Sequence, residues 1–211
     1  MKNEFENCRI VLASKSPRRK ELLEKAGLSF TIMPAVGEEV TTESTPEKIV
    51  AELAKNKATE VYQKLMKDKD FFKKDGRPLL VIGADTVVFI DGKILGKPRD
   101  EEDAAMMLRM LSGRTHMVAT GLSLIYKEPG HCLRRRTGYE TSQVSFFSLS
   151  DDAIMDYIKT GEPMDKAGSY AIQGIGGKFV KEPKENFSNI MGLPVDRVLA
   201  EIRLILGKPV C

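Results

Sequence analysis

The most apolar stretch of the chain, residues 79–90, is interrupted by a single carboxylate. Such a run, followed by the turn signal Asp91-Gly92, predicts a buried strand and a hairpin that returns over residues 93–95. Asp85 then lies within a buried strand, where an isolated charge is costly unless it is paired, protonated or bound to metal. The structural alternative is an aspartate bonded to backbone amides at a bulge beside Gly83. We favour a functional carboxylate.

A second informative stretch joins a predicted strand, residues 9–12, to a predicted helix that ends at Gly27. Ser16 is the expected N-cap, and Pro17 suits the first helical position. Helix amides, hydroxyl groups and the guanidinium groups of Arg18 and Arg19 would meet there, which favours a phosphate. A capped surface helix with solvated arginines is the alternative. The spacing matches neither a P-loop nor a dinucleotide fingerprint.

Residues 46–66 predict an amphipathic helix with Pro46 at its first position. Lys57 interrupts the apolar stripe of this helix and lies about 20° from Val50 around the axis. A lysine on a buried face needs either an anion or a route to water. We favour an anion site for Lys57.

The remaining elements follow from caps and alternation. We expect a helix after Asp100, a long strand over residues 115–126 with a partner over 136–148, a helix after Ser150 and a final helix over 195–206. The charged connector 67–77 is expected to be a mobile excursion, and the glycine-rich stretch 161–177 a binding loop. His116 and His131 lack metal-ligand spacing and are expected at the surface or a sheet edge.

Composition limits the class of protein. The 211 residues carry a formal charge of +3, which is too small and dispersed to imply nucleic-acid binding. Three widely spaced cysteines give neither a disulfide framework nor a zinc site, which favours a reducing compartment. The polar N-terminus lacks a signal-peptide pattern, and no run of about 18 apolar residues predicts a membrane span. We therefore expect a cytoplasmic protein that binds neither membranes nor nucleic acid.

Cations and carboxylates recur in separated segments, which suits metal-assisted chemistry on a polyphosphate. The chain resembles the Maf (septum-formation-inhibitor-like) nucleoside triphosphate pyrophosphatases, whose motifs it carries in the same order. The resemblance spans residues 9 to about 195 and rests on Leu12-Ala13-Ser14-x-Ser16-Pro17-Arg18-Arg19, Lys57-Ala58, Gly83-Ala84-Asp85-Thr86, Gly96-Lys97-Pro98, Leu111-Ser112-Gly113, Glu162-Pro163-Met164-Asp165-Lys166-Ala167-Gly168 and Ile172-Gln173-Gly174.

The resemblance implies an α/β fold like that of inosine triphosphate pyrophosphatases, in which a mixed elongated sheet is flanked by helices and two lobes surround a cleft. It implies one domain over residues 1–211 and hydrolysis of a nucleoside triphosphate to the monophosphate and pyrophosphate with Mg²⁺ or Mn²⁺. Its carried-over roles are Asp85 as proton acceptor, with Lys57 and Lys97 also catalytic; Ser14, Arg18, Arg19, Thr86 and Gln173 on the substrate; and Asp85 with Glu39 on the metal. Glu38 is an open alternative to Glu39, and a homodimer is left open.

Gln173 allows a substrate to be inferred from hydrogen bonding. A uracil or thymine edge presents an N–H donor between two carbonyl acceptors, and a glutamine amide can pair with the N–H and one carbonyl. A 7-methylguanine edge shows two donors and would favour a carboxylate. Ile172-Gln173-Gly174 thus resembles the branch that hydrolyses dTTP and UTP. A 7-methyl-GTP pyrophosphatase and a non-enzymatic nucleotide-binding regulator of cell division are the alternatives.

Overall fold

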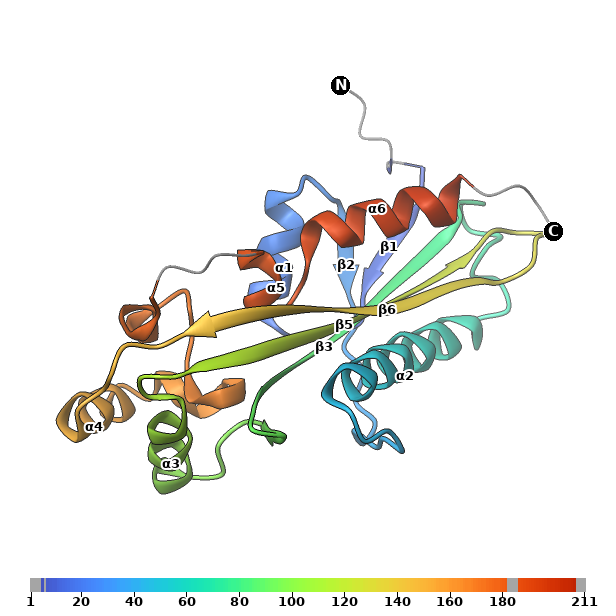
Figure 1. The fold of residues 1–211 in the computed structure, drawn as a ribbon. Helices are drawn as coiled ribbons and strands as arrows, with labels where there is room; N and C mark the ends of the chain where they lie inside the picture. The colour runs from blue at the N-terminus through green and yellow to red at the C-terminus, as the bar shows by residue number, and fades with distance from the viewer. Residues whose placement is uncertain (1–4, 6, 182–185, 208–211) are drawn as a thin grey trace.

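The computed structural model describes residues 5, 7–181 and 186–207, and it shows a mixed α/β fold around one long sheet (Figure 1). The strand order is β2-β1-β3-β5-β6, with β4 paired to β3. The strands are β1 (Arg9–Leu12), β2 (Phe30–Ile32), β3 (Leu79–Ile90), β4 (Lys93–Leu95), β5 (Thr115–Lys127) and β6 (Arg134–Ser145). β1 is parallel to β2 and β3, and the other pairs are antiparallel.

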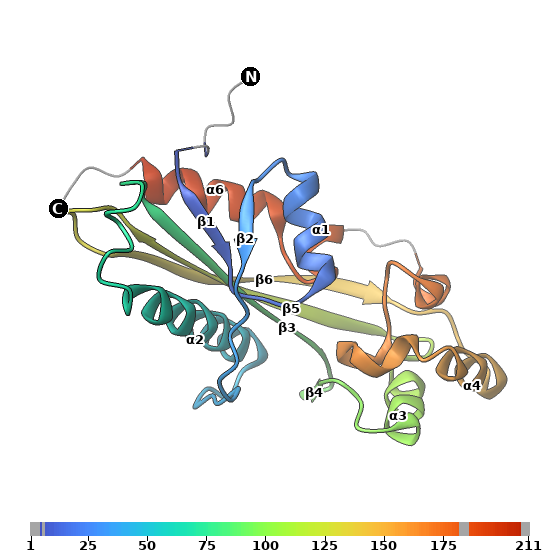
Figure 2. The same ribbon diagram turned by 180° about the vertical axis from the view of Figure 1, so that it is seen from behind.

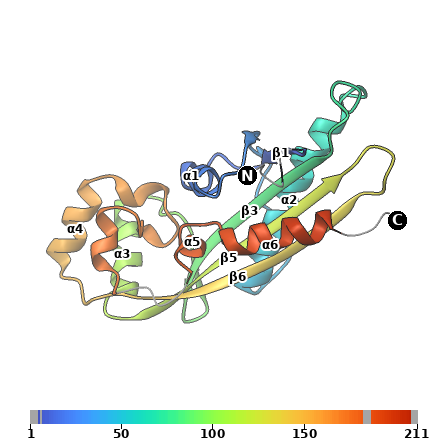
Figure 3. The same ribbon diagram turned by 90° about the horizontal axis from the view of Figure 1, so that it is seen from above.

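The helices form two groups along this sheet (Figure 3). Near the β1 end, α2 (Pro46–Met66) covers one face, and α1 (Pro17–Lys25) and α6 (Val195–Leu206) cover the other, as the two opposed views show (Figures 1 and 2). At the far end lie α3 (Glu101–Leu111), α4 (Asp151–Lys159) and the short 3₁₀ turns η1 (Glu162–Asp165), η2 (Ala167–Ser169) and η3 (Ile175–Phe179). The helix α5 (Phe187–Ile190) contacts β5 and β6.

Strand alternation explains the two cores at the β1 end. Leu80 and Ile82 pack with residues of α1 and α6, whereas Leu79 and Val81 pack with residues of α2. Successive side chains of a strand point to opposite faces, so Asp85 has the parity of the α2 face. A separate core at the far end gathers α3, α4 and the ends of the long strands.

Two glycines let α2 lie unusually close to the sheet. A Cβ at Gly83 would stand 2.3 Å from the carbonyl oxygen of Ala54, and one at Gly121 would stand 2.0 Å from that of Val50. These separations exclude any side chain at either glycine without a shift of the helix. The bulge considered at Gly83 is absent, because β3 and β5 stay in continuous register from Leu79 to Phe89.

One edge of β3 is interrupted. β1 pairs with β3 as far as Ile82, and β4 pairs with it from Val88 onward. Between these points residues 83–87 have β5 on one side and no strand of the described chain on the other. Asp85 and Thr86 therefore border an opening in the sheet edge.

The predicted N-caps of α3 and α4 are confirmed. The side chain of Asp100 accepts a hydrogen bond from the amide of Asp103, and that of Ser150 accepts one from Ala153. The cap predicted at Ser16 is only partly right. Ser16 occupies the N-cap position of α1, but its hydroxyl makes no capping bond, and its own amide donates to the hydroxyl of Ser14 at 3.2 Å.

Two further expectations are wrong. His116 is 2% exposed and lies in the core at the far end, because its face of the strand is covered there, while the neighbouring Thr115 is exposed and Met117 is partly exposed on the other face. Cys132 is disulfide-bonded, although the number and spacing of the cysteines were expected to give no disulfide framework. Cys8 is a free thiol, and Cys211 lies outside the described residues. None of the described helices is both long and apolar enough to cross a membrane.

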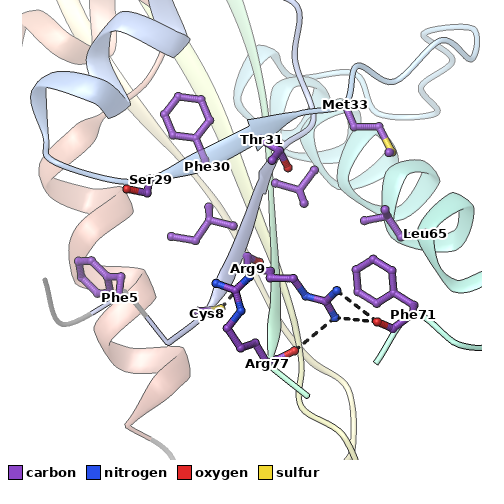
Figure 4. A pocket seen from close by; sticks show the side chains of 12 residues that line it. Phe5, Cys8, Arg9, Ser29, Phe30, Thr31, Met33, Leu65, Phe71 and Arg77 are labelled. Atoms are coloured by element: carbon purple, nitrogen blue, oxygen red, sulfur yellow. Dashed lines mark hydrogen bonds between the residues drawn. The ribbon is translucent and has the colours of Figure 1, made fainter. Parts of the chain in front are cut away.

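The connector 67–77 is anchored to the start of β1 rather than free. The Arg9 guanidinium donates to the carbonyl oxygens of Phe71 at 3.2 Å and Arg77 at 3.4 Å, and it lies 3.8 Å from the Phe71 ring centre (Figure 4). Arg9, Phe71 and Arg77 line a cavity of about 470 Å³ together with Phe30 and neighbouring side chains. Both arginines of this cavity bond to the connector: Arg9 through the carbonyl oxygens given above, and Arg77 through Asp75 at 2.8 Å.

Candidate active site

A cleft of about 880 Å³ opens at the interrupted edge of β3. Its wall is formed by the β1–α1 turn, the open stretch of β3, the segment after β4, and residues of the 165–172 and 190–192 segments. The volume is in the range of nucleotide-sized ligand sites. Six basic residues, Lys15, Arg18, Arg19, Lys57, Lys97 and Lys166, and three acidic ones, Glu39, Asp85 and Asp165, line it. Positive charge therefore predominates, which favours an anionic ligand.

Lys57 joins two carboxylates at the centre of the cleft. Its Nζ lies 2.5 Å from Asp85 Oδ1 and 2.7 Å from Glu39 Oε1. The Asp85 and Lys57 side chains are 11% and 18% exposed, whereas that of Glu39 is 61% exposed. The hydrogen bond from Lys57 holds the pKa of Glu39 below its usual value. Of the adjacent Glu38 and Glu39, it is Glu39 that pairs with Lys57, and Lys57 thus has two carboxylate partners.

Arg19 is held by uncharged partners. Its Nε donates to the carbonyl oxygen of Gly192 at 2.8 Å, Nη1 donates to Ser14 Oγ at 3.1 Å, and Nη2 donates to Thr86 Oγ1 at 3.0 Å. Desolvation lowers the pKa of this guanidinium, and Asp85 acts in the opposite direction. Since no carboxylate of the described residues bonds to it, Arg19 supplies a fixed positive charge beside Asp85.

A chain of hydroxyl and amide groups behind Arg19 continues into the sheet. Thr86 Oγ1 lies 3.0 Å from Thr120 Oγ1, and Thr120 donates to the carbonyl oxygen of Asn189 at 3.0 Å. Asn189 Nδ2 donates to Ser142 Oγ at 2.9 Å. Sequence reasoning missed Thr120, Asn189 and Ser142. The available signal was the presence of the polar residues Thr120 and Ser142 inside predicted strands, whereas nothing marked Asn189.

Gly192 completes the Arg19 site and was also missed. Its φ is +107°, a conformation that glycine adopts readily. A Cβ there would stand 3.2 Å from Thr86 Oγ1 and 3.7 Å from Arg19 Nε. Only a glycine therefore lets this carbonyl reach the guanidinium without strain.

Arg18 and Lys97 are two of the cleft cations without an internal anion among the described residues, and Lys15 is another. The side chains of Arg18 and Lys97 make no hydrogen bond or ion pair with the part of the chain that the structure describes. Burial lowers the pKa of Arg18, and the nearby Asp165 partly offsets this effect. Both cations can therefore bind phosphate oxygens without first breaking a salt bridge.

Gln173 is exposed and stands outside the residues that line the cleft, whereas the neighbouring Ile172 and Tyr170 line it. Glu162 fixes this segment: its carboxylate accepts the amides of Ile175 at 3.1 Å and Gly176 at 3.0 Å, and the Tyr157 hydroxyl at 2.8 Å. Burial pushes the pKa of Glu162 up, but these donors outweigh it and the pKa is lowered. Gln173 lies between the fixed ends of this loop.

His116 supports the cleft wall from behind. Its Nε2 lies 2.9 Å from the hydroxyl of Tyr170, and its ring meets those of Phe146 and Tyr170 edge-on. Its Nδ1 has no hydrogen-bond partner in the described chain. Burial lowers the pKa of His116 to about 4, so the imidazole is neutral at pH 7.

The carboxylates of Asp85 and Glu39 are candidate ligands for a metal ion. Among the described residues no three His, Cys, Asp or Glu side chains gather as a ready-made cage. Mg²⁺, however, is commonly held by one or two carboxylates together with substrate phosphates and water. Asp85 and Glu39 meet at one Nζ, so both carboxylates reach a common point in a cleft that suits phosphate. This donor set fits a hard divalent cation.

The fold and the cleft define an α/β protein whose mainly cationic cleft holds a pair of carboxylates. The model of the Maf-like protein family matches residues 9–205, and the chain belongs to this family. It is 46% identical to a dTTP/UTP pyrophosphatase of Agathobacter rectalis over 92% of this chain and 96% of that protein. It is also 46% identical to one of Thermococcus kodakarensis, over 89% and 92% of the two chains.

Solved structures give a weaker likeness. A nucleoside-triphosphatase / dITP/XTP pyrophosphatase of Mycobacterium abscessus overlaps 95% of this chain and 98% of its own, with 14% identity and a TM-score of 0.40. The Ham1 protein of Staphylococcus aureus overlaps 92% and 99%, with 14% identity and a TM-score of 0.37. The description of the fold rests on the strand order and the helix layers of this chain alone.

Proposed function

We propose that this protein is a nucleoside triphosphate pyrophosphatase that hydrolyses dTTP and UTP to the monophosphate and pyrophosphate. The observation that carries the proposal is the ion pair of Asp85 with Lys57, beside Glu39, in a cleft that holds unneutralised cations. A cleft that only bound nucleotide would gain nothing from a buried carboxylate facing phosphate. The names of the relatives at 46% identity support the same activity and substrates.

The phosphates would occupy the cationic part of the cleft. Arg18 and Lys97 would bind the phosphate oxygens, and Arg19, fixed by Ser14, Thr86 and Gly192, would stabilise negative charge on the α-phosphate without moving. Because Arg19 already uses three of its five N–H groups internally, its contribution is mostly electrostatic.

Asp85 is the proposed proton acceptor. A water oxygen bonds to the α-phosphorus while the bond from that phosphorus to the bridging oxygen breaks, and pyrophosphate leaves with the electron pair. The water proton goes to a carboxylate oxygen of Asp85. Lys57 holds this carboxylate in place and neutralises it before the proton is taken.

Glu39 and Asp85 would hold a Mg²⁺ or Mn²⁺ ion. When bound, such an ion neutralises phosphate charge and lowers the pKa of a water molecule. The two carboxylates supply the protein part of that coordination, and Lys57 would release at least one of them to do so.

The cytoplasmic location and the homodimer stay predictions.

Base recognition is assigned to the wall at Tyr170 and Ile172 and to Gln173 in the same loop. The amide of Gln173 would pair with the N–H and one carbonyl of uracil or thymine. Since Gln173 is exposed in this structure, this assignment requires its side chain to turn towards the cleft when nucleotide binds.

A pyrophosphate-release assay with a panel of nucleoside triphosphates, with Mg²⁺ or Mn²⁺, tests the proposal. We expect UTP and dTTP to have the highest kcat/KM and the products to be the monophosphate and pyrophosphate. Nucleotide binding without pyrophosphate release would instead identify a binding protein. A preference for 7-methyl-GTP would overturn the substrate assignment alone.

A further inference from the structure

The outward side of α2 carries three polar residues, Glu52, Asn56 and Glu60, at intervals of four. This spacing places them in one line along the helix. The buried residues of α2, among them Leu53 and Val61, belong to the side that packs on the sheet. The line is therefore free to bind another segment, and the loop formed by residues 34–45, here called the Glu39 loop, runs along it.

Glu60 binds the first part of the Glu39 loop. Its Oε1 accepts the amide of Val36 at 2.8 Å, and its Oε2 accepts the amide of Gly37 at 3.1 Å. A Cβ at Gly37 would stand 3.0 Å from the same Oε2. The glycine thus permits a close approach of the loop backbone to the carboxylate.

Glu52 and Asn56 bind the second part of the loop. The Glu52 carboxylate accepts the Thr41 hydroxyl at 2.5 Å and the Thr42 amide at 2.9 Å. Asn56 Nδ2 donates to the carbonyl oxygen of Val40 at 3.3 Å. The loop therefore runs antiparallel to α2, from Glu60 at its start to Glu52 at its end.

Apolar burial does not explain this placement. Val36 is 82% exposed and Val40 is 62% exposed, so the two large apolar side chains of this stretch face solvent. The loop is held on α2 chiefly by the polar bonds of Glu52, Asn56 and Glu60. Glu39 lies between the residues bound by Glu60 and those bound by Asn56 and Glu52, and its carboxylate meets Lys57, the residue next to Asn56.

We propose that Glu52 and Glu60 are positioning residues for the divalent-cation site: they fix the Glu39 loop on α2 so that Glu39 faces Asp85 across Lys57. They touch neither substrate nor metal and act through Glu39. The inference rests on the proposed role of Glu39 and adds the residues that set its position.

The test measures Mn²⁺ binding to the full chain without nucleotide, from the free-ion signal in electron paramagnetic resonance. The variants are Glu52→Ala, Glu60→Ala, their combination and Glu39→Gln. Glu47→Ala is the matched control, because it removes the same charge from the same helix and makes no bond to the loop. Alanine preserves helix propensity, and circular dichroism checks folding.

We expect the combined variant to raise the Kd for Mn²⁺ about tenfold, close to the effect of Glu39→Gln, as loss of outer residues does at other metal sites. In a Glu39→Gln background the same two changes should have no further effect, since residues acting through one group are not additive. Hydrogen exchange of the Val36, Gly37 and Thr42 amides should accelerate in the combined variant and not in Glu47→Ala.

The outcomes separate the two proposals. If Glu39→Gln leaves Mn²⁺ binding unchanged, the metal role of Glu39 is wrong, and the positioning role falls with it. If Glu39→Gln weakens binding but the combined variant binds Mn²⁺ as the unmodified protein does, only the positioning role is overturned. Equal weakening by Glu47→Ala would also overturn it, because helix charge alone would then explain the effect.

Discussion

Lys57 Nζ lies 2.5 Å from Asp85 Oδ1, although the two residues are 28 positions apart in the chain. The contact joins the one lysine of α2 that is not exposed with the carboxylate inside β3. Removing either charge leaves the other without this partner, and two of the predictions below follow from that.

Asp85→Asn should reduce pyrophosphate release from UTP by about a thousandfold, within the range that a general base contributes. An amide cannot take the proton from water, but its oxygen can still accept a hydrogen bond from Lys57. The thermal unfolding midpoint should therefore stay close to that of the unmodified protein. Near-normal turnover by the folded variant would show that Asp85 is not the proton acceptor.

Lys57→Met should lower the free energy of unfolding by about 2 kcal/mol at pH 7, because it leaves the mostly buried Asp85 carboxylate without its partner. Combining it with Asp85→Asn should restore most of the loss. Urea denaturation of the single and double variants measures the difference. If the double variant is no more stable than Lys57→Met, the ion pair does not account for the effect.

Gly192→Ala should destabilise the protein by about 1–3 kcal/mol and reduce turnover, because φ is +107° and the new Cβ would crowd Thr86 and Arg19. Gly130→Ala is the control, since Gly130 also has a positive φ, of 77°, but nothing within 4 Å of its Cβ position. Chemical denaturation and kcat/KM should show a loss of turnover for Gly192→Ala alone. Equal losses in both variants would indicate backbone strain only.

His116 should make stability fall with acid. Its pKa is about 4 in the folded protein against 6.5 for the ordinary side chain, so the unfolded chain binds more protons between these values. The stability that neutral His116 contributes is fully present above pH 6.5 and is lost as the pH falls towards 4. The loss is about 2 kcal/mol at pH 5. His116→Gln should show a correspondingly smaller loss of stability between pH 7 and pH 5. The same loss in both proteins would contradict the assignment.

Gln173→Glu should weaken turnover of UTP and dTTP about a hundredfold and raise the preference for 7-methyl-GTP. An ionised glutamate can only accept, so it places a repulsive oxygen against the pyrimidine carbonyl. The measurement is kcat/KM for the three nucleotides with both proteins. An unchanged ratio of UTP to 7-methyl-GTP would show that Gln173 does not read the base.

The sequence allowed the elements and the two central charged residues to be predicted for local reasons. Pro46, Asp100 and Ser150 mark helix starts by capping chemistry, and these starts are confirmed. Lys57 and Asp85 stood out because each placed a charge in an apolar pattern. That they meet each other could not be predicted, because it depends on how α2 crosses the sheet.

Long-range polar contacts were the part that sequence reasoning missed. Thr120 and Asn189 look like ordinary strand and turn residues until the fold brings them behind Arg19. His116 was misplaced for a related reason: nothing in its strand indicated that the far-end core would cover the face that carries it. Whether the site residues perform their assigned roles stays a prediction.

The glycines at positions 83 and 121 set the height of a helix above a sheet. A methyl group at either position would clash with a backbone carbonyl of α2, and the helix would have to move away from the sheet to make room for it. Lys57 sits one residue before Ala58, which crowds the same Gly83, so raising the helix would lift the ammonium away from Asp85. The distance between the Lys57 ammonium and the Asp85 carboxylate is thus fixed by the absence of a side chain at Gly83 and Gly121.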